Sequence, residues 1–136
     1  MTHWTFKVFV DERGYDLFDE WKDLPPAAEA QIDVRINLLK VSKTWARPYA
    51  GKIRNCRHIW EIRVRHNRVQ YRPLGYYGPG IGVFTLLIGA IEKDRKFIPK
   101  AAPEIAENRR IKISTDEKRY TRDYRPKTGI NKKVIK

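Results

Sequence analysis

Cysteine is almost absent from this sequence of 136 residues, which contains Cys56 and no other. A single cysteine excludes an intrachain disulfide and a zinc site built from several thiolates. Long apolar runs are also absent, since no stretch approaches the roughly 18 residues that span a membrane. The N-terminal MTHWTFKVFV shows no signal-peptide pattern. We therefore expect a cytoplasmic protein without a membrane partner.

Signatures of metal sites and activated nucleophiles are missing as well. The histidines His3, His58 and His66 have no Cys, Asp or Glu at ligand spacing, and no pair of aspartates fits a two-metal nuclease. The sequence has no Gly-rich phosphate loop and no G-x-S-x-G motif. We expect no metal and no cofactor, so chemistry on a nucleic acid would depend on basic side chains.

Acidic residues are scarce relative to basic ones. The chain has 16 Asp and Glu against 29 Lys and Arg, a net charge of +13. Such an excess indicates an anionic partner, which is a nucleic acid, an anionic membrane surface or an acidic protein. The length suits one domain with a substantial core rather than two.

The hydrophobic pattern predicts an α+β domain in the order βααβββα. We expect a mostly antiparallel twisted sheet, with a helical hairpin on one face, a C-terminal helix, and the other face open. The strand over 83–91 is apolar on both parities, which predicts a central strand covered on both faces. The predicted elements are a strand at 4–10, helices at 15–23 and 26–43, a strand hairpin at 59–74, the strand at 83–91 and a helix at 103–113.

The C-terminal residues differ in character from the rest. From Ser114 onward no periodic apolar pattern is visible, and basic residues outnumber acidic ones. We therefore divide the chain into a domain over 1–113 and a basic tail over 114–136 that is mobile or becomes ordered on binding.

The segment 59–74, IWEIRVRHNRVQYRPL, is predicted to carry its basic side chains on one face of a hairpin. Its first strand places Trp60, Ile62 and Val64 on one side, and Glu61, Arg63 and Arg65 on the other. A turn at His66-Asn67 sets the pairs Arg65 with Arg68, Arg63 with Gln70, and Glu61 with Arg72. Like charges opposite each other destabilise a sheet, so the first pair indicates either a bound anion or a face solvated by water.

Basic side chains alone can support RNA cleavage, because the 2′-hydroxyl of the RNA is itself the nucleophile. The protein must align the attack, stabilise charge on the phosphoryl oxygens and move protons. Arginine matches phosphate oxygens with its planar fork, and lysine in a positive cluster can act as a base. The candidate catalytic residues are Arg63, Arg72, Lys93 and Lys96. The candidate RNA-binding residues are Lys52, Arg54, Arg57, Arg65, Arg68, Tyr120 and Tyr124.

Simpler interpretations stay open for several of these residues. Arg72 opposite Glu61 could form an ion pair with a purely structural role. Lys93 could be an ordinary turn lysine whose side chain is solvated. His58 could be an ordinary residue at the end of a strand, without a catalytic role. Tyr120 and Tyr124 in the tail could be aromatic residues that bind nothing.

The order of the motifs resembles the RelE/HigB superfamily of bacterial toxins, and most closely its phage-derived Gp49-like branch. The matching segments are FDEWKDLPP at 18–26, IWEIRV at 59–64, VQYRPL at 69–74 and FTLLIGAIEK at 84–93. The resemblance implies a RelE-like fold and a toxin that cleaves mRNA in the ribosomal A site. It also implies a co-encoded antitoxin as partner, which we expect to be a helix-turn-helix protein from the adjacent gene.

The same resemblance implies roles for individual residues. Arg63 and Arg72 occupy the arginine positions of the family, and Lys93 occupies the first lysine position of its post-strand motif. The histidine and second lysine of that motif are missing, because this chain has Gly89 and Asp94 there. Lys96 or His58 would have to compensate for them.

Two other functions fit the same features. Relatives in the superfamily target gyrase, and a basic sheet can bind nucleic acid or an acidic antitoxin without catalysis. A degenerate, inactive phage protein is the third alternative, which the missing histidine supports.

Overall fold

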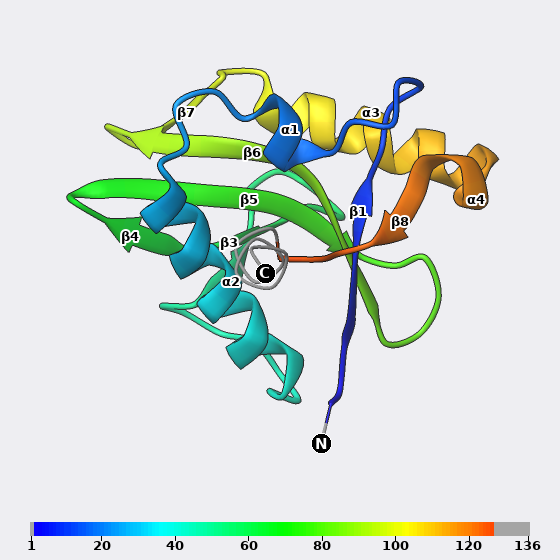
Figure 1. Cartoon of the computed structure of the whole chain (residues 1–136), viewed down its shortest axis with the longest axis horizontal. Helices are drawn as coiled ribbons and strands as arrows, with labels where there is room; N and C mark the ends of the chain where they lie inside the picture. Colours follow the sequence, from blue (N-terminus) through cyan, green and yellow to red (C-terminus); the bar gives the residue numbers. More distant parts are fainter. Residues whose placement is uncertain (1, 127–136) are drawn as a thin grey trace, which may run out of the picture.

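In the computed structural model, which describes residues 2–126, an eight-stranded sheet carries helices on both faces (Figure 1). The strand order is β2-β3-β5-β6-β1-β8, with β4 paired to β5 and β7 paired to β6. All pairs are antiparallel except β1 with β6, so the predicted α+β class is confirmed. The strands are β1 (Thr5–Phe9), β2 (Ala50–Lys52), β3 (Trp60–Ile62), β4 (Val64–His66), β5 (Val69–Tyr77), β6 (Val83–Lys93), β7 (Lys96–Ile98) and β8 (Thr121–Asp123). The helices are α1 (Leu17–Glu20), α2 (Pro26–Lys40), α3 (Ala102–Thr115) and α4 (Glu117–Tyr120).

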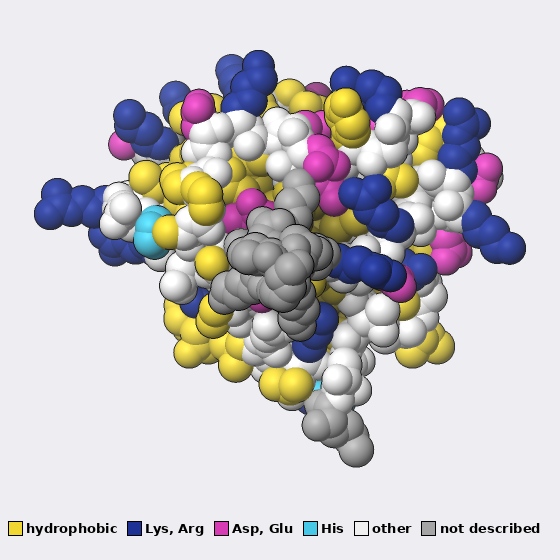
Figure 2. All heavy atoms as spheres, in the orientation of Figure 1, with side chains coloured by type: hydrophobic (Ala, Val, Ile, Leu, Met, Phe, Trp, Pro, Cys, Tyr) yellow, Lys and Arg dark blue, Asp and Glu magenta, His cyan; other side chains and the backbone are white. Residues whose placement is uncertain are grey.

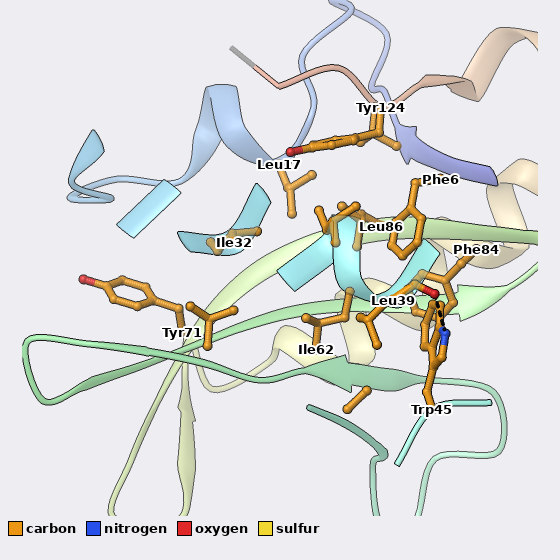
Figure 3. Packing of buried hydrophobic residues seen from close by; sticks show 14 of the residues in the cluster. Phe6, Leu17, Ile32, Leu39, Trp45, Ile62, Tyr71, Phe84, Leu86 and Tyr124 are labelled. Carbon is orange, nitrogen blue, oxygen red and sulfur yellow. Dashed lines mark hydrogen bonds between the residues drawn. The ribbon is translucent and has the colours of Figure 1, made fainter. Parts of the chain in front are cut away.

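The core on one face lies between the sheet and α2. Ala28, Ile32, Ile36 and Leu39 recur at helical spacing and are fully buried, as their pattern predicts. They pack against residues from several strands, including Phe6, Ile62 and Leu86 (Figure 3). Trp45 closes this core, and its indole Nε1 donates a 3.0 Å hydrogen bond to the Leu39 carbonyl. None of the helices over residues 2–126 is long and apolar enough to cross a membrane.

A second core covers much of the opposite face, where α3 packs against β5 and β6. Ala102, Ala106 and Ile113 are buried there with Leu74 and Ile88. The expectation of one open face is therefore wrong over this part of the sheet. Only Ala102, Ala106 and Ile113 of α3 are buried, so the sequence pattern does not reveal how much of the sheet this helix covers. Exposed side chains persist on this face at the β4–β5 end.

β6 is the central strand, as its two apolar faces predict. Its pairing with β5 changes register between Leu74 and Gly75, which leaves Leu87 as an extra residue on β6. Phe84 and Leu86 face α2, whereas Leu87 and Ile88 both join the core under α3. Before the bulge the even-numbered residues of β6 face α2, and after it the even-numbered residues face α3.

The predicted boundary after residue 113 lies inside α3, and residues 114–126 belong to the folded domain. β8 pairs with β1, and Tyr124 donates from its hydroxyl to Asp33 at 2.7 Å. Tyr120 stacks on Phe9 with ring centroids 5.9 Å apart. Both tyrosine rings are buried, so the predicted stacking of these rings on RNA bases is wrong. The remainder of the predicted tail, 127–136, lies outside the described residues.

The hairpin has a register that differs by two residues from the predicted one. Its turn is Asn67-Arg68, where both residues have positive φ, and Arg65 lies opposite Gln70. A shift of one residue exchanges the faces of a strand, whereas a shift of two preserves them, so alternation cannot distinguish the two registers. The predicted opposition of Arg65 to Arg68 is therefore wrong, although both strands present the expected faces.

Candidate functional site

Basic side chains occur around much of the surface seen in Figure 2, so charge alone does not locate a site. Two adjoining pockets, of about 330 and 290 Å³, are lined mainly by charged side chains and share Arg47 and Arg63 in their linings. We call them together the arginine groove. Its charged and polar lining residues are Arg35, Arg47, Tyr49, Lys52, Arg54, Glu61, Arg63, Arg65, Gln70, Arg72, Glu92 and Arg95.

Arg63 lies at the centre of the groove, at the break between β3 and β4. Its backbone N–H donates to the Tyr49 carbonyl at 2.9 Å, and its own carbonyl accepts a hydrogen bond from Nη1 of Arg35. Its half-buried guanidinium lies 3.5 Å from Glu61. Hydrogen bonds with Tyr49 and Arg35 thus hold both backbone groups of Arg63, so the position of its Cα and the direction of its side chain are fixed.

Arg72 lies beneath the groove in a buried cluster with two carboxylates. Only 1% of Arg72 is exposed. Its Nε donates to Glu92 at 2.9 Å and lies 3.8 Å from Glu61. Its two other nitrogens donate to the Tyr71 carbonyl and to the Gln70 side chain. All three nitrogens are thus engaged by the protein, and the predicted pairing with Glu61 exists as a diagonal contact across the strands.

The pKa values of this cluster reflect burial. Burial lowers the pKa of Arg72, and Glu61 and Glu92 oppose this shift. Burial also raises the pKa of the Glu61 carboxyl, with partial compensation from Arg72 and Arg63. An arginine remains charged despite such a shift, because its ordinary pKa is above 12. Burial thus outweighs the two neighbouring arginines, and the pKa of the Glu61 carboxyl lies above its ordinary value.

Replacing Glu61 with Gln should change how stability depends on pH. Folding raises the pKa of Glu61, so the folded protein holds this proton more tightly than the unfolded chain does. The resulting cost is absent below the ordinary pKa of 4.5 and grows as the pH rises through the raised pKa. The free energy of unfolding of the wild type, relative to Glu61→Gln, should therefore fall as pH rises from about 4 and then level off.

Urea unfolding across this pH range measures that difference, with Glu104→Gln at an exposed position of α3 as the control substitution. A difference between wild type and Glu61→Gln that stays constant, or that increases with pH, would show that the pKa of Glu61 is not raised.

The structure assembles part of the predicted site. Lys52, Arg54, Arg63 and Arg65 all line the arginine groove. Arg57 lines an adjoining pocket of about 660 Å³ that also contains Arg47, Lys52 and Arg54. Arg68 is exposed at the β4–β5 turn, at the end of the sheet.

The other predicted catalytic residues lie elsewhere. Lys93 and Lys96 form an exposed cross-strand pair, and the parity after the bulge points them away from the groove while Glu92 faces into it. His58 is exposed near α3, where it adds to the effect of Arg110 in lowering the pKa of Glu107. The structure therefore does not bring these three residues to Arg63.

Several groove residues have no signal in the sequence. Arg35 comes from α2 and donates to the carbonyl of Arg63, and Tyr49 belongs to the loop before β2. Glu61 was visible as a partner for Arg72, but its burial and its raised pKa depend on the tertiary structure. Among the described residues, no three His, Cys, Asp or Glu side chains form a group suited to a metal ion.

Comparison with known families gives one match. Residues 19–111 match the family model described as "Phage derived protein Gp49-like (DUF891)". This range contains every residue that lines the arginine groove. No curated protein and no solved structure matches the chain.

Proposed function

The chain belongs to the phage-derived Gp49-like family, which is associated with the toxins of toxin–antitoxin systems, and from this premise we propose that it cleaves mRNA on the ribosome. The observation that carries the proposal is the arginine groove with Glu61 embedded in it. The proposal also places the chain in the RelE/HigB superfamily and its site of action in the cytoplasm.

The groove contains the groups that RNA cleavage requires. Glu61 accepts the proton of the 2′-hydroxyl as that oxygen attacks the adjacent phosphorus. Arg63 binds the phosphoryl oxygens, on which negative charge increases in the transition state. The bond to the 5′-oxygen breaks, and this oxygen takes a proton from a water molecule in the open groove. Glu61 then returns its proton to the resulting hydroxide, and the products are a 2′,3′-cyclic phosphate and a 5′-hydroxyl. No step requires a nucleophile from the protein.

The remaining basic residues bind the RNA backbone. Arg47, Lys52 and Arg54 line the groove beside Arg63 and are exposed. Each can neutralise a phosphate, so affinity for RNA should decrease with salt. The ribosome supplies a single-stranded mRNA in a fixed geometry, which the shallow groove alone does not impose.

An antitoxin is the partner that this family implies. We propose that it is encoded by the adjacent gene, contains a helix-turn-helix domain and neutralises the toxin by binding. A net charge of +13 favours an acidic binding surface on that partner.

Induced expression in a bacterial host, followed by mapping of mRNA 5′ ends, tests the proposal. We expect growth arrest together with new 5′ ends inside coding regions. These ends should disappear when initiation of translation is blocked, because the substrate is mRNA on the ribosome. Growth arrest with intact mRNA and induction of a DNA-damage response would instead favour a gyrase-targeting toxin.

A further inference from the structure

Tyr49 presents an aromatic ring to the arginine groove. The residue is 44% exposed, although large aromatic side chains are usually covered. It lines the same pocket as Arg47, Arg63 and Arg65. An exposed ring among cationic side chains is the combination that proteins use to bind single-stranded nucleic acid.

The ring is held in place by Arg35. The guanidinium carbon of Arg35 lies 4.7 Å from the centroid of the Tyr49 ring, a cation–π arrangement. The same Arg35 donates to the carbonyl of Arg63, and the Tyr49 carbonyl accepts from the N–H of Arg63. Each of Tyr49, Arg35 and Arg63 therefore contacts the other two. These contacts hold the Tyr49 ring in a fixed position relative to the Arg63 backbone.

A second Arg–Tyr pair in the protein lacks this setting. Tyr15 is 47% exposed, and the Arg13 guanidinium lies 4.4 Å from the centroid of its ring. Arg13 is, however, paired with Asp11 at 2.7 Å, and neither Tyr15 nor Arg13 lines the groove. Of these two pairs, the Tyr49 pair is the one that lies among the arginine side chains of the groove.

We propose that Tyr49 and Arg35 form a platform on which one RNA base stacks, beside the phosphate bound by Arg63. This inference rests on the proposed function and adds a base-binding subsite to it. Stacking uses the π-face that every base has, so the platform positions the RNA without selecting a sequence. A base on this platform fixes the nucleotide next to the scissile bond, which favours in-line attack.

Binding of short single-stranded RNA tests the platform separately from cleavage. The probe is a fluorescent RNA with 2′-O-methyl groups, which cannot be cleaved, and its partner is the same backbone with abasic internal positions. Fluorescence anisotropy gives the affinity of the full-length wild type, Tyr49→Leu, Tyr49→Trp and the matched control Tyr15→Leu for both probes. Thermal unfolding of each variant confirms that it is folded.

We expect Tyr49→Leu to weaken binding of the base-containing RNA by about tenfold, the effect of losing one stacked base. Binding of the abasic probe should not change, because its phosphates remain. Tyr49→Trp should keep the wild-type affinity, since indole also stacks, and Tyr15→Leu should match the wild type on both probes.

Equal affinity of the wild type for the two probes would overturn the platform without the need for any variant. An equal loss by Tyr49→Leu on both probes, or no loss on either, would also overturn it. The proposed nuclease fails on a different result, which is intact mRNA after induced expression. Base-dependent binding that requires Tyr49 would then stand without the nuclease.

Discussion

Arg63→Ala should lower mRNA cleavage by about 10²–10³-fold, the usual effect of removing one group that stabilises charge in a transition state. Arg63 is one of the two residues that line both pockets of the groove, and its side chain approaches Glu61, the proposed proton acceptor. Its backbone hydrogen bonds to Tyr49 and Arg35 do not involve the side chain, so the local structure should persist. The measurement is the yield of new mRNA 5′ ends after induction at matched protein levels.

Arg68→Ala is the matched control, because it removes an arginine of the same hairpin that does not line the groove. We expect nearly full cleavage from this variant. Arg63→Lys should fall between the two, since lysine keeps the charge but loses the planar fork that matches two phosphate oxygens. Equal cleavage by Arg63→Ala and the wild type would remove Arg63 from the mechanism.

Arg72→Met should destabilise the protein by about 3–5 kcal/mol, the usual cost of removing one member of a buried ion pair. The variant leaves Glu61 and Glu92 without the cation that they both contact, at a position that is 1% exposed. Such a loss is a large fraction of the roughly 5–15 kcal/mol that stabilises a typical domain. Denaturant unfolding at low temperature measures it, and the loss should shrink at acidic pH, where the two carboxyl groups become neutral.

The control is Arg110→Met, which breaks the more exposed contact between Arg110 and Glu107 on α3. A pair of that kind contributes about 0–1 kcal/mol. If Arg72→Met instead kept the stability of the wild type but lost cleavage, Arg72 would act on the substrate. The two outcomes separate a structural cation from a catalytic one.

The sequence predicted part of the candidate site for a definite reason. Alternation in the hairpin separated Arg63 and Arg65 from Ile62 and Val64, and the structure has the same separation. The register was wrong because a shift of two residues leaves that separation intact. Local periodicity thus reports the face of a strand and not the partner opposite each residue.

The face on which Lys93 lies could not be predicted from the sequence either. An uninterrupted β6 that places Phe84 and Leu86 toward α2 would place Lys93 on the groove face. The extra residue Leu87 reverses the parity, so Glu92 enters the groove and Lys93 faces away. A strand that is apolar on both faces gives no pattern from which a bulge can be located.

The sequence by itself determined a basic α+β protein with a central strand, an amphipathic second helix and a hairpin with arginines on one face. These features follow from composition and from periodicity within single elements, which burial of apolar surface enforces. The tertiary structure decided that Arg35, Tyr49 and Arg63 meet, that Glu61 is buried beside Arg72, and that Lys93 does not join them. These contacts depend on register, on one bulge and on helix packing, which arise only when distant segments come together.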